Sequence, residues 1–304
     1  MFSNEALAVW VVETDRRSWP RRADNVHMAS TTTRTYADAL AAARSRDGGF
    51  ALARGGHSET EPTAVAALAL DDPVARAWLA RAQRRDGGFA AADGRPESPS
   101  VAALAALALA DDPGSSSRAF AHALANRAST VGESGSGDQN GRDGWGWTND
   151  TYAWVEPTSR ILLATKVLRA GDSATRAEAL RILRERQCVD GGWNYGNTSV
   201  KGVDLRGYAQ TTAVALMALQ GDAPSLVDPG LRFLEKRWRD EPGGLTLAQS
   251  AVALDLHRAD GVGELHAALG ATFHKTEFLG NVLTLGWAAL ASAPSAVNRL
   301  RIES

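Results

Sequence analysis

One short pattern recurs along the chain: an aspartate, one or two glycines, and then usually a large aromatic residue. Such a turn needs glycine, because glycine adopts positive φ without steric cost. Copies spaced about 40 to 57 residues apart are typical of a repeat architecture. The sequence therefore predicts a series of similar units rather than a single irregular fold. The copies are Asp47–Phe50, Asp86–Phe89, Asp143–Trp145, Asp190–Trp193 and a degenerate Gly243–Leu245.

An apolar run rich in alanine and leucine follows most of these turns. Threonine or serine before such a run is an N-cap signal, and proline is tolerated in the first helical turn. Alanine and leucine on all sides predict helices that are buried on most faces. The six expected helices are 60–70, 97–109, 155–168, 209–219, 248–256 and 279–291; the last has no Asp-Gly-Gly turn before it.

Amphipathic segments with charged faces alternate with the apolar runs. Six helices that are apolar all round cannot each be buried against one partner, but they can form an inner ring that six amphipathic helices cover. We therefore expect an all-α fold, an α6/α6 toroid, built as one domain over residues 1–304. The outer helices are expected at about 34–45, 74–84, 115–127, 173–186, 225–239 and 262–272.

Two segments do not belong to the repeats. Residues 1–32 are expected to form an N-terminal extension that packs on the barrel. Residues 129–142 are rich in glycine and serine, which predicts a flexible insertion. That insertion is either a surface loop or a lid over the cavity.

Composition excludes several classes of protein. A net charge of −2 gives no electrostatic basis for binding nucleic acid. No apolar run approaches the roughly 20 residues that span a bilayer, and the N-terminus lacks the basic start of a secretory signal. The single cysteine, Cys188, excludes a disulfide framework. We expect a soluble cytoplasmic protein; the sequence leaves its oligomeric state open.

Two of the turns resemble a known family. Gln187–Trp193 (QCVDGGW) and Gln83–Phe89 (QRRDGGF) are similar to the QW repeat of squalene–hopene cyclases and related class II terpene cyclases. The chain also resembles the β subunits of protein prenyltransferases from about Thr33 onward. The resemblance implies the toroid, an isoprenoid or similar apolar substrate, and a structural role for the QW turns. Squalene cyclases carry a second helical barrel, whereas this length fits one.

The zinc site of the protein prenyltransferases is not reproduced. That family binds zinc through an aspartate, a cysteine two residues later and a histidine on a following helix. Asp190 matches the first ligand, but Gly192 stands at the cysteine position and Gln210 at the histidine position. Zinc needs three or four N, S or O ligands. We therefore expect no metal and no cofactor, with Mg²⁺ relevant only if the substrate carries a diphosphate.

The acid motif of class II cyclases is present in altered form. That family protonates an alkene with the middle aspartate of Asp-x-Asp-Asp-Thr-Ala. Here the matching stretch is Glu59-Thr-Glu-Pro-Thr-Ala64, which puts Glu61 at the acid position and Pro62 in place of the last aspartate. Alkene protonation requires a strong acid with coupled partners. His57 is close enough in sequence to serve as one.

The carboxylate at Glu61 is interpreted as recurring in the next two repeats, as Glu97 and Glu156, with Gln210 in the fourth. In a toroid these helix starts lie at one end of the barrel. The residues could form an acid cluster with raised proton affinity. They could instead be structural carboxylates that the helix dipole favours and loop arginines neutralise.

Aromatic and basic residues surround this predicted mouth. Aromatic faces suit an apolar or carbocationic ligand, although they could equally fill the turn. Charged residues are unusual on a buried helix, so Arg160 and Lys166 either counter the carboxylates or bind an anion such as a diphosphate. The candidate catalytic residues are Glu61, Glu59 and Glu156; the candidate substrate-binding residues are Glu97, Trp147, Tyr152, Trp154, Arg160, Tyr208 and Gln210.

Three functions follow from these residues. The first is a single-barrel, terpene-cyclase-like enzyme that uses a cavity carboxylic acid. The second is an isoprenoid-binding or scaffold protein that has lost the Asp-x-Asp-Asp acid. The third is a different enzyme on the same barrel, such as a glycosidase with two carboxylates across the mouth.

Overall fold

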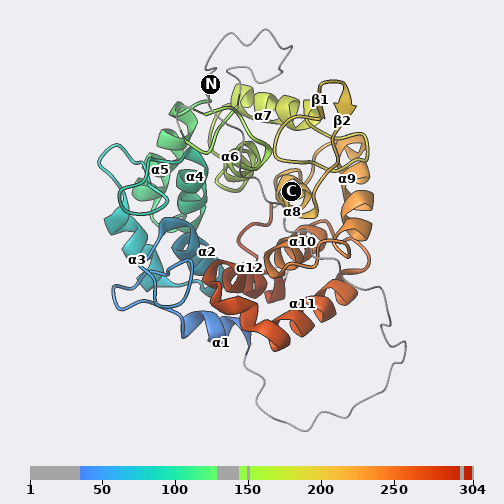
Figure 1. Cartoon of the computed structure of the whole chain (residues 1–304). Helices are drawn as coiled ribbons and strands as arrows, with labels where there is room; N and C mark the ends of the chain where they lie inside the picture. Colours follow the sequence, from blue (N-terminus) through green and yellow to red (C-terminus); the bar gives the residue numbers. More distant parts are fainter. Residues whose placement is uncertain (1–34, 129–143, 149–150, 295–297, 303–304) are drawn as a thin grey trace, which may run out of the picture. The chain divides into compact units, whose positions relative to one another are not determined.

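The computed structural model describes residues 35–128, 144–148, 151–294 and 298–302, all within one compact unit, Arg34–Ser304. Described residues in this unit form twelve α-helices, one short 3₁₀ helix and one two-stranded sheet (Figure 1). The prediction of an all-α fold is confirmed. The predicted extension, 1–32, and all of the predicted insertion, 129–142, lie outside the described residues.

The even-numbered helices are the apolar ones. Almost every side chain in them is buried, because alanine and leucine occupy all faces. The inner helices are α2 (Thr60–Leu70), α4 (Pro99–Ala108), α6 (Val155–Val167), α8 (Ala209–Ala218), α10 (Gly244–Leu256) and α12 (Val282–Ser292).

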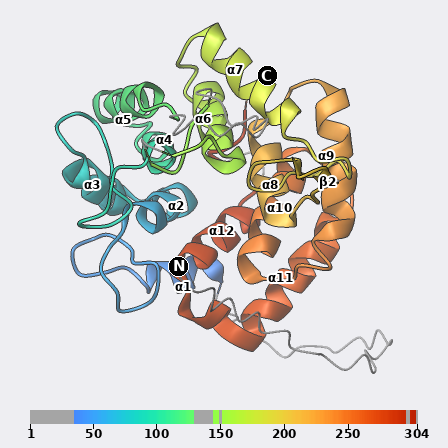
Figure 2. The same ribbon diagram turned by 45° about the horizontal axis from the view of Figure 1, so that its top comes forward.

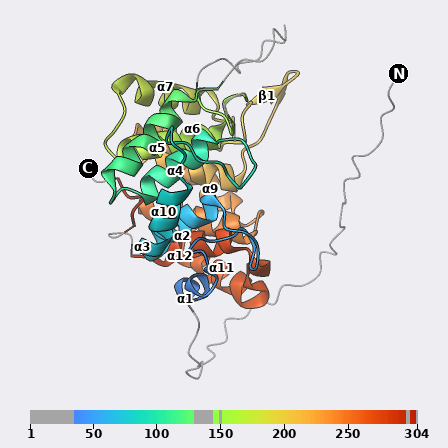
Figure 3. The ribbon, with the colours of Figure 1, turned by 90° about the vertical axis from the view of Figure 1, so that its left-hand side faces the viewer.

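The odd-numbered helices carry charged residues on one face and cover the inner ones. In the view of Figure 3, α3 and α5 are on the side that faces the reader. These outer helices are α1 (Tyr36–Ala41), α3 (Pro73–Ala82), α5 (Pro113–Ala125), α7 (Ser173–Glu185), α9 (Pro224–Arg237) and α11 (Val262–Thr276).

Contacts between the helices close a ring. Each inner helix packs against the next one along the chain, and α12 packs against α2 (Figures 1 and 2). Five outer helices pack against the inner helix that precedes them in sequence. The sixth pair is formed by α1 and α12, which come from opposite ends of the described chain. These are the neighbours that an α6/α6 toroid requires.

The repeated turns connect each outer helix to the next inner one. In three copies the aspartate carboxylate accepts a hydrogen bond from the N–H of the second glycine, for example Asp86 Oδ1 from Gly88 at 2.9 Å. The first glycine has positive φ in each of them, +89° at Gly191. A β-carbon at Gly191 would lie 2.7 Å from the carbonyl oxygen of Pro229. Both the backbone conformation and the close approach therefore require glycine.

Glutamine and tryptophan of the QW turn have separate partners. The Gln187 amide donates to Gly191 O (2.8 Å) and to Leu226 O on α9 (3.0 Å), so it joins one outer helix to the next. The backbone N–H of Trp193 donates to the hydroxyl of Thr212 on α8 at 2.9 Å. Gln83 likewise donates to Ser115 O on α5 at 2.9 Å. These turns have a structural role, and the glutamine links outer helices rather than an outer helix to an inner one.

Several helix boundaries differ from the sequence-based expectation. Helix α4 begins at Pro99 because Glu97 is extended and pairs with Ala90 in an antiparallel bridge. Helix α12 begins at Val282 rather than Leu279, because Leu279 has positive φ in the 3₁₀ segment Glu277–Gly280. Helix α10 starts earlier and α11 ends later than expected. The strands β1 (Ser199–Val200) and β2 (Val203–Asp204) form a small hairpin before α8, which was not predicted from the sequence.

Candidate functional site

Backbone hydrogen bonds define which residues are equivalent at the starts of the inner helices. The N–H of the N-cap residue donates to the carbonyl of the turn aromatic: Glu59 to Phe50, Ser98 to Phe89, Trp154 to Trp145 and Tyr208 to Trp193. The second residue of each helix is then Glu61 in α2, Ser100 in α4, Glu156 in α6 and Gln210 in α8. Glu61, Glu156 and Gln210 are equivalent, as the sequence predicted.

Glu97 does not occupy this position. It lies one residue before its N-cap and is equivalent to Ser58 of the first repeat, as the bridges Ala51–Ser58 and Ala90–Glu97 show. Its carboxylate pairs with Arg84 at 2.7 Å and lies 3.3 Å from the ring of His122. The prediction that Glu97 repeats Glu61 is therefore wrong. The reason is that Pro99 is the first residue of α4, whereas Pro62 is the third residue of α2, so the two prolines are not equivalent.

A buried arginine brings two carboxylates together at the predicted mouth. Nη2 of Arg160 on α6 binds Glu156 Oε1 at 2.6 Å and also pairs with Glu61 Oε1 on α2. Glu156 is 8 % exposed and Arg160 is 5 % exposed. Helices α2 and α6 are separated by α4 in the ring order. The contact therefore connects two non-adjacent inner helices. We refer to Glu61, Glu156 and Arg160 as the carboxylate–arginine cluster.

The charge of the cluster favours a bound proton. Two carboxylates and one guanidinium carry a net charge of −1 when all are ionised, and burial of a net charge is costly. Burial raises the pKa of Glu156, although the charge of Arg160 opposes this; the nearby Glu61 carboxylate raises it further. Glu59 adjoins the cluster, and its pKa is also raised, by partial burial and then by repulsion from Glu61.

Arg160 keeps a donor free of hydrogen bonds within the described residues. Its Nη1 atom is buried without a hydrogen-bond acceptor there. The guanidinium carbon lies 5.9 Å from the centre of the Trp147 ring, within the range of a cation–π contact. Trp147 is half-buried. Of the predicted site residues, Glu61, Glu156, Arg160 and Trp147 therefore lie together.

The remaining predicted residues lie around the turns. Trp154, the half-buried N-cap of α6, packs against the backbone near Gly196. Tyr208 is exposed and lies against Tyr195, with ring centres 5.3 Å apart. Tyr152 is exposed, and Gln210 is half-buried. His57, which was considered as a partner for the acid, is exposed.

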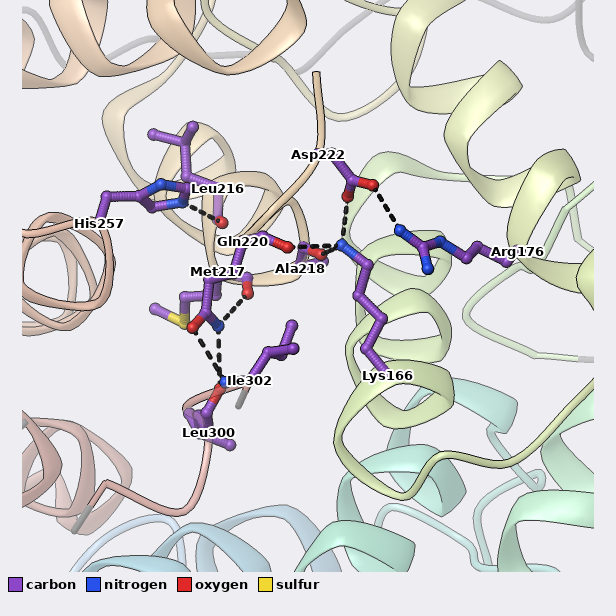
Figure 4. Close-up of polar contacts among 10 residues, drawn as sticks. All are labelled: Lys166, Arg176, Leu216, Met217, Ala218, Gln220, Asp222, His257, Leu300 and Ile302. Carbon is purple, nitrogen blue, oxygen red and sulfur yellow. Dashed lines mark hydrogen bonds and ion pairs between the residues drawn. The ribbon is translucent and has the colours of Figure 1, made fainter. Parts of the chain in front are cut away.

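Lys166 belongs to a different cluster (Figure 4). It lies ten residues after Glu156 on α6, about 15 Å along the helix axis. Its ammonium group pairs with Asp222 and donates to the carbonyls of Ala218 (2.8 Å) and Gln220 (2.9 Å) at the end of α8. Burial lowers the pKa of Lys166, although Asp222 opposes the shift. Lys166 therefore caps α8 and does not counter the carboxylates.

The same cluster attaches the end of the described chain. The Gln220 amide donates to Leu300 O at 2.9 Å, and Gln220 Oε1 accepts from Ile302 N–H at 3.1 Å (Figure 4). Asp222 and Gln220 were not among the residues predicted from the sequence. A signal was present, since acidic residues recur after the inner helices, but nothing in the sequence linked Asp222 to Lys166.

Cys188 lies inside the QW turn and is buried. Burial raises the pKa of its thiol, which disfavours the reactive thiolate. Its sulfur accepts a hydrogen bond from the Asn194 amide at 3.4 Å. These surroundings fit a packed side chain in the turn.

No helix among the described residues is both long and apolar enough to cross a membrane.

Comparison with models of protein families and with curated proteins gave no match. Among solved structures, a protein from Actinoplanes is 16 % identical, with a TM-score of 0.48 over 86 % of this chain and 80 % of that one. Type II terpene cyclase MstE from Scytonema, solved with geranylgeranyl dihydroxybenzoate, is 16 % identical, with a TM-score of 0.47 over 86 % and 78 %. Its complex with merosterolic acid A is 18 % identical, with a TM-score of 0.47 over 86 % and 79 %. Likenesses at this level do not place the chain in a family.

Proposed function

We propose that this protein is a terpene-cyclase-like enzyme that binds an isoprenoid or similar apolar substrate inside the helical ring. The carboxylate–arginine cluster would supply the acid that starts a cyclisation of the class II type. One observation carries the proposal: two carboxylates from non-adjacent inner helices share a single buried guanidinium nitrogen, and burial raises the pKa of Glu156. The QW turns, which resemble those of class II cyclases, support it independently.

The proposed step transfers one proton. The O–H bond of protonated Glu156 breaks, a C–H bond forms on an alkene carbon, and a carbocation results. The new carboxylate is left beside Arg160, whose charge stabilises it and partly offsets the increase in pKa that burial causes. Loss of a proton from the final cation restores the cluster. Glu61 holds Arg160 in position, and Trp147 offers an aromatic face near the cation.

Glu59 is proposed as a second proton-holding carboxyl next to the cluster, since its pKa is also raised. Nη1 of Arg160, which has no hydrogen-bond acceptor among the described residues, would bind a polar atom of the substrate or a water molecule. Of the other predicted binding residues, Trp154, Tyr152, Tyr208 and Gln210 would line the approach from the turns. No metal is assigned to the cluster; Mg²⁺ would act only on a diphosphate substrate.

Two variants test the acid. A panel of linear isoprenoids, with and without diphosphate and with and without Mg²⁺, would be incubated with the protein and products identified by mass spectrometry. We expect Glu156→Gln to lower turnover by at least about 100-fold, the lower range for loss of a general acid. Glu185→Gln removes an exposed carboxylate on the outer helix α7 and serves as the matched control, with activity retained. Equal turnover in Glu156→Gln and wild type would contradict the proposed acid.

A second candidate is a non-catalytic isoprenoid-binding protein. The observation in its favour is that Arg160 already pairs with both carboxylates, as in a purely structural ion pair. A bound isoprenoid that is recovered unchanged after prolonged incubation would support this candidate. A glycosidase is disfavoured, because the guanidinium occupies the space between the two carboxylates where a glycosidic bond would have to lie.

A further inference from the structure

The side chains that face the turn aspartate differ from one repeat to the next. In the first repeat, Asp47 faces Ser58 from the following loop and Trp78 from the next outer helix. Asp47 accepts hydrogen bonds from the Ser58 hydroxyl (2.7 Å) and the Trp78 indole (2.9 Å). The groups that face the Asp47 carboxylate from the loop and from α3 are therefore a neutral hydroxyl and an indole.

The fourth repeat has neither group at the same position. There Asp190 accepts from the backbone N–H of Gly207 at 3.0 Å. A β-carbon on Gly192 would meet the ring of Phe233 on α9 at 2.7 Å, as one on Gly49 would meet Trp78 at 2.8 Å. The residues in the places of Ser58 and Trp78 are therefore Gly207 and Phe233, and neither has a titratable side chain.

The second repeat places a glutamate and a histidine at this position. Nε2 of His122, on α5, lies 3.3 Å from Glu97 Oε2, and Nδ1 lies 3.7 Å from Asp86 Oδ2. Asp86, Glu97 and His122 each offer a donor atom within 4.8 Å of the others. His122 is 8 % exposed, whereas Asp86 is exposed to solvent.

The histidine is not satisfied by its neighbours. Nε2 of His122 is buried and makes no hydrogen bond within the described residues, although Glu97 is close enough for one. The carboxylate therefore lies off the direction in which Nε2 donates or accepts. Two ligand atoms that each lie about 2.1 Å from one tetrahedral metal ion are about 3.4 Å from each other. The lone pair of each atom then points at the ion and not at the other ligand atom. The Nε2–Oε2 separation fits this arrangement.

We propose that Asp86, Glu97 and His122 bind a divalent transition-metal ion such as Zn²⁺. One nitrogen and two carboxylate oxygens are ligands that such ions accept, and a water molecule at the exposed side of Asp86 completes the coordination. The ion joins the turn, the loop before α4 and the outer helix α5. Its role is to hold this repeat together, and it is independent of the carboxylate–arginine cluster and of the proposed function.

Arg84 competes with the metal for one ligand. Its guanidinium pairs with Glu97 at 2.7 Å and is about half exposed, so it can leave the carboxylate at little cost. Removing Arg84 frees Glu97 and also removes a positive charge near the ion. The Arg84→Gln protein should therefore bind the metal more tightly than wild type, an effect that adventitious binding to surface histidines would not show.

The test is a titration of the full chain, stripped with a chelator, with Zn²⁺ by calorimetry and with Co²⁺ by visible absorption. Wild type should bind one equivalent. His122→Phe copies Phe233 and should abolish binding at this site. Glu97→Gln keeps the shape of the side chain but removes a direct ligand of the ion. Its metal affinity should therefore fall by more than the roughly 10–100-fold that follows loss of a group that only hydrogen-bonds to a ligand. Asp47→Asn, the same kind of change in a turn without histidine, should have no effect.

Two results would overturn the site. One is a folded wild-type protein that binds neither ion at stoichiometric concentration. The other is Glu97→Gln or His122→Phe protein that binds as tightly as wild type. Thermal melting confirms that each variant is folded; if His122→Phe is not, Glu97→Gln, with its unchanged volume, decides between the outcomes.

Discussion

Single residues in this protein depend on what the ring places beside them. Glu61 and Glu156 are equivalent in their repeats, and both carboxylates bind Arg160. Glu97, which looked similar in sequence, pairs instead with Arg84 because it lies before the N-cap. Glu61 is the second residue of helix α2, whereas Glu97 lies in an extended segment three positions before the equivalent residue, Ser100. The same residue type therefore has two different environments.

The raised pKa of Glu156 predicts a pH-dependent stability. The folded state keeps the Glu156 proton at pH values where the unfolded chain, with its usual pKa of about 4.3, has lost it. This contribution is fully present below about pH 4 and is lost as pH rises through the folded pKa. Wild type should therefore lose stability relative to Glu156→Gln as pH rises, by at most about 1.4 kcal/mol per pH unit.

Chemical denaturation of both proteins between about pH 4 and 8 would measure this difference. Glu185→Gln is the matched control, since Glu185 is exposed and, among the described residues, pairs with Arg181 on its own helix. Parallel stability curves for wild type and Glu156→Gln would mean that Glu156 is ionised throughout that range.

At the scale of elements, the turns position the helices by close contact. The aspartate fixes the turn, the glutamine binds the next outer helix, and the backbone of the aromatic binds the next inner helix. Gly191 combines a positive φ with close contact to Pro229 on α9. Gly202, in the β1–β2 hairpin, also has positive φ, but no atom lies within 4 Å of where its β-carbon would be.

Substitutions at these two glycines distinguish the cost of backbone strain from the cost of a steric clash. Gly202→Ala should lower the free energy of unfolding by about 1–2 kcal/mol, the cost of a left-handed conformation in an L-residue. Gly191→Ala carries the same strain and also displaces α9, so we expect a clearly larger loss. Equilibrium urea denaturation would compare the two. Equal losses of unfolding free energy in the two variants would show that α9 moves away from the new methyl group at no cost in free energy.

At the scale of the whole molecule, the ring is closed by contacts between the ends of the described chain. Helix α12 packs against α2, and α1 packs against α12. Gly286 on α12 permits the first contact, since a β-carbon there would lie 2.7 Å from Val65 Cγ1 on α2. Val65 is fully buried and its branched side chain has little freedom to move.

Alanine at Gly286 should therefore weaken ring closure, even though alanine favours a helix by about 1 kcal/mol over glycine. We expect overpacking of about 1–3 kcal/mol to exceed that gain and lower the melting temperature. Gly263→Ala, on the outer helix α11 with open space around it, should instead raise the melting temperature. Calorimetry of both variants checks the opposite signs. A stabilised Gly286→Ala protein would mean that the α12–α2 contact adapts freely.

Local sequence determined the helices and their order. Runs of alanine and leucine can only be buried, capping residues mark their starts, and the Asp-Gly-Gly turns separate them, so all twelve α-helices were predicted near their observed positions. Boundaries failed where a segment stayed extended or took positive φ, at Glu97 and at Leu279. Those states depend on contacts with a neighbouring turn, which the local pattern does not contain.

The pairing of side chains was decided by the tertiary structure alone. Glu61 and Arg160 are 99 residues apart, and Lys166 and Asp222 are 56 residues apart. Composition showed that the inner helices carry charges, but not which charges meet, because closing the ring sets the distance between helices that are remote in sequence. The sequence determined a ring of buried helices with carboxylates at their starts; only the closed ring decided that two of them share one arginine.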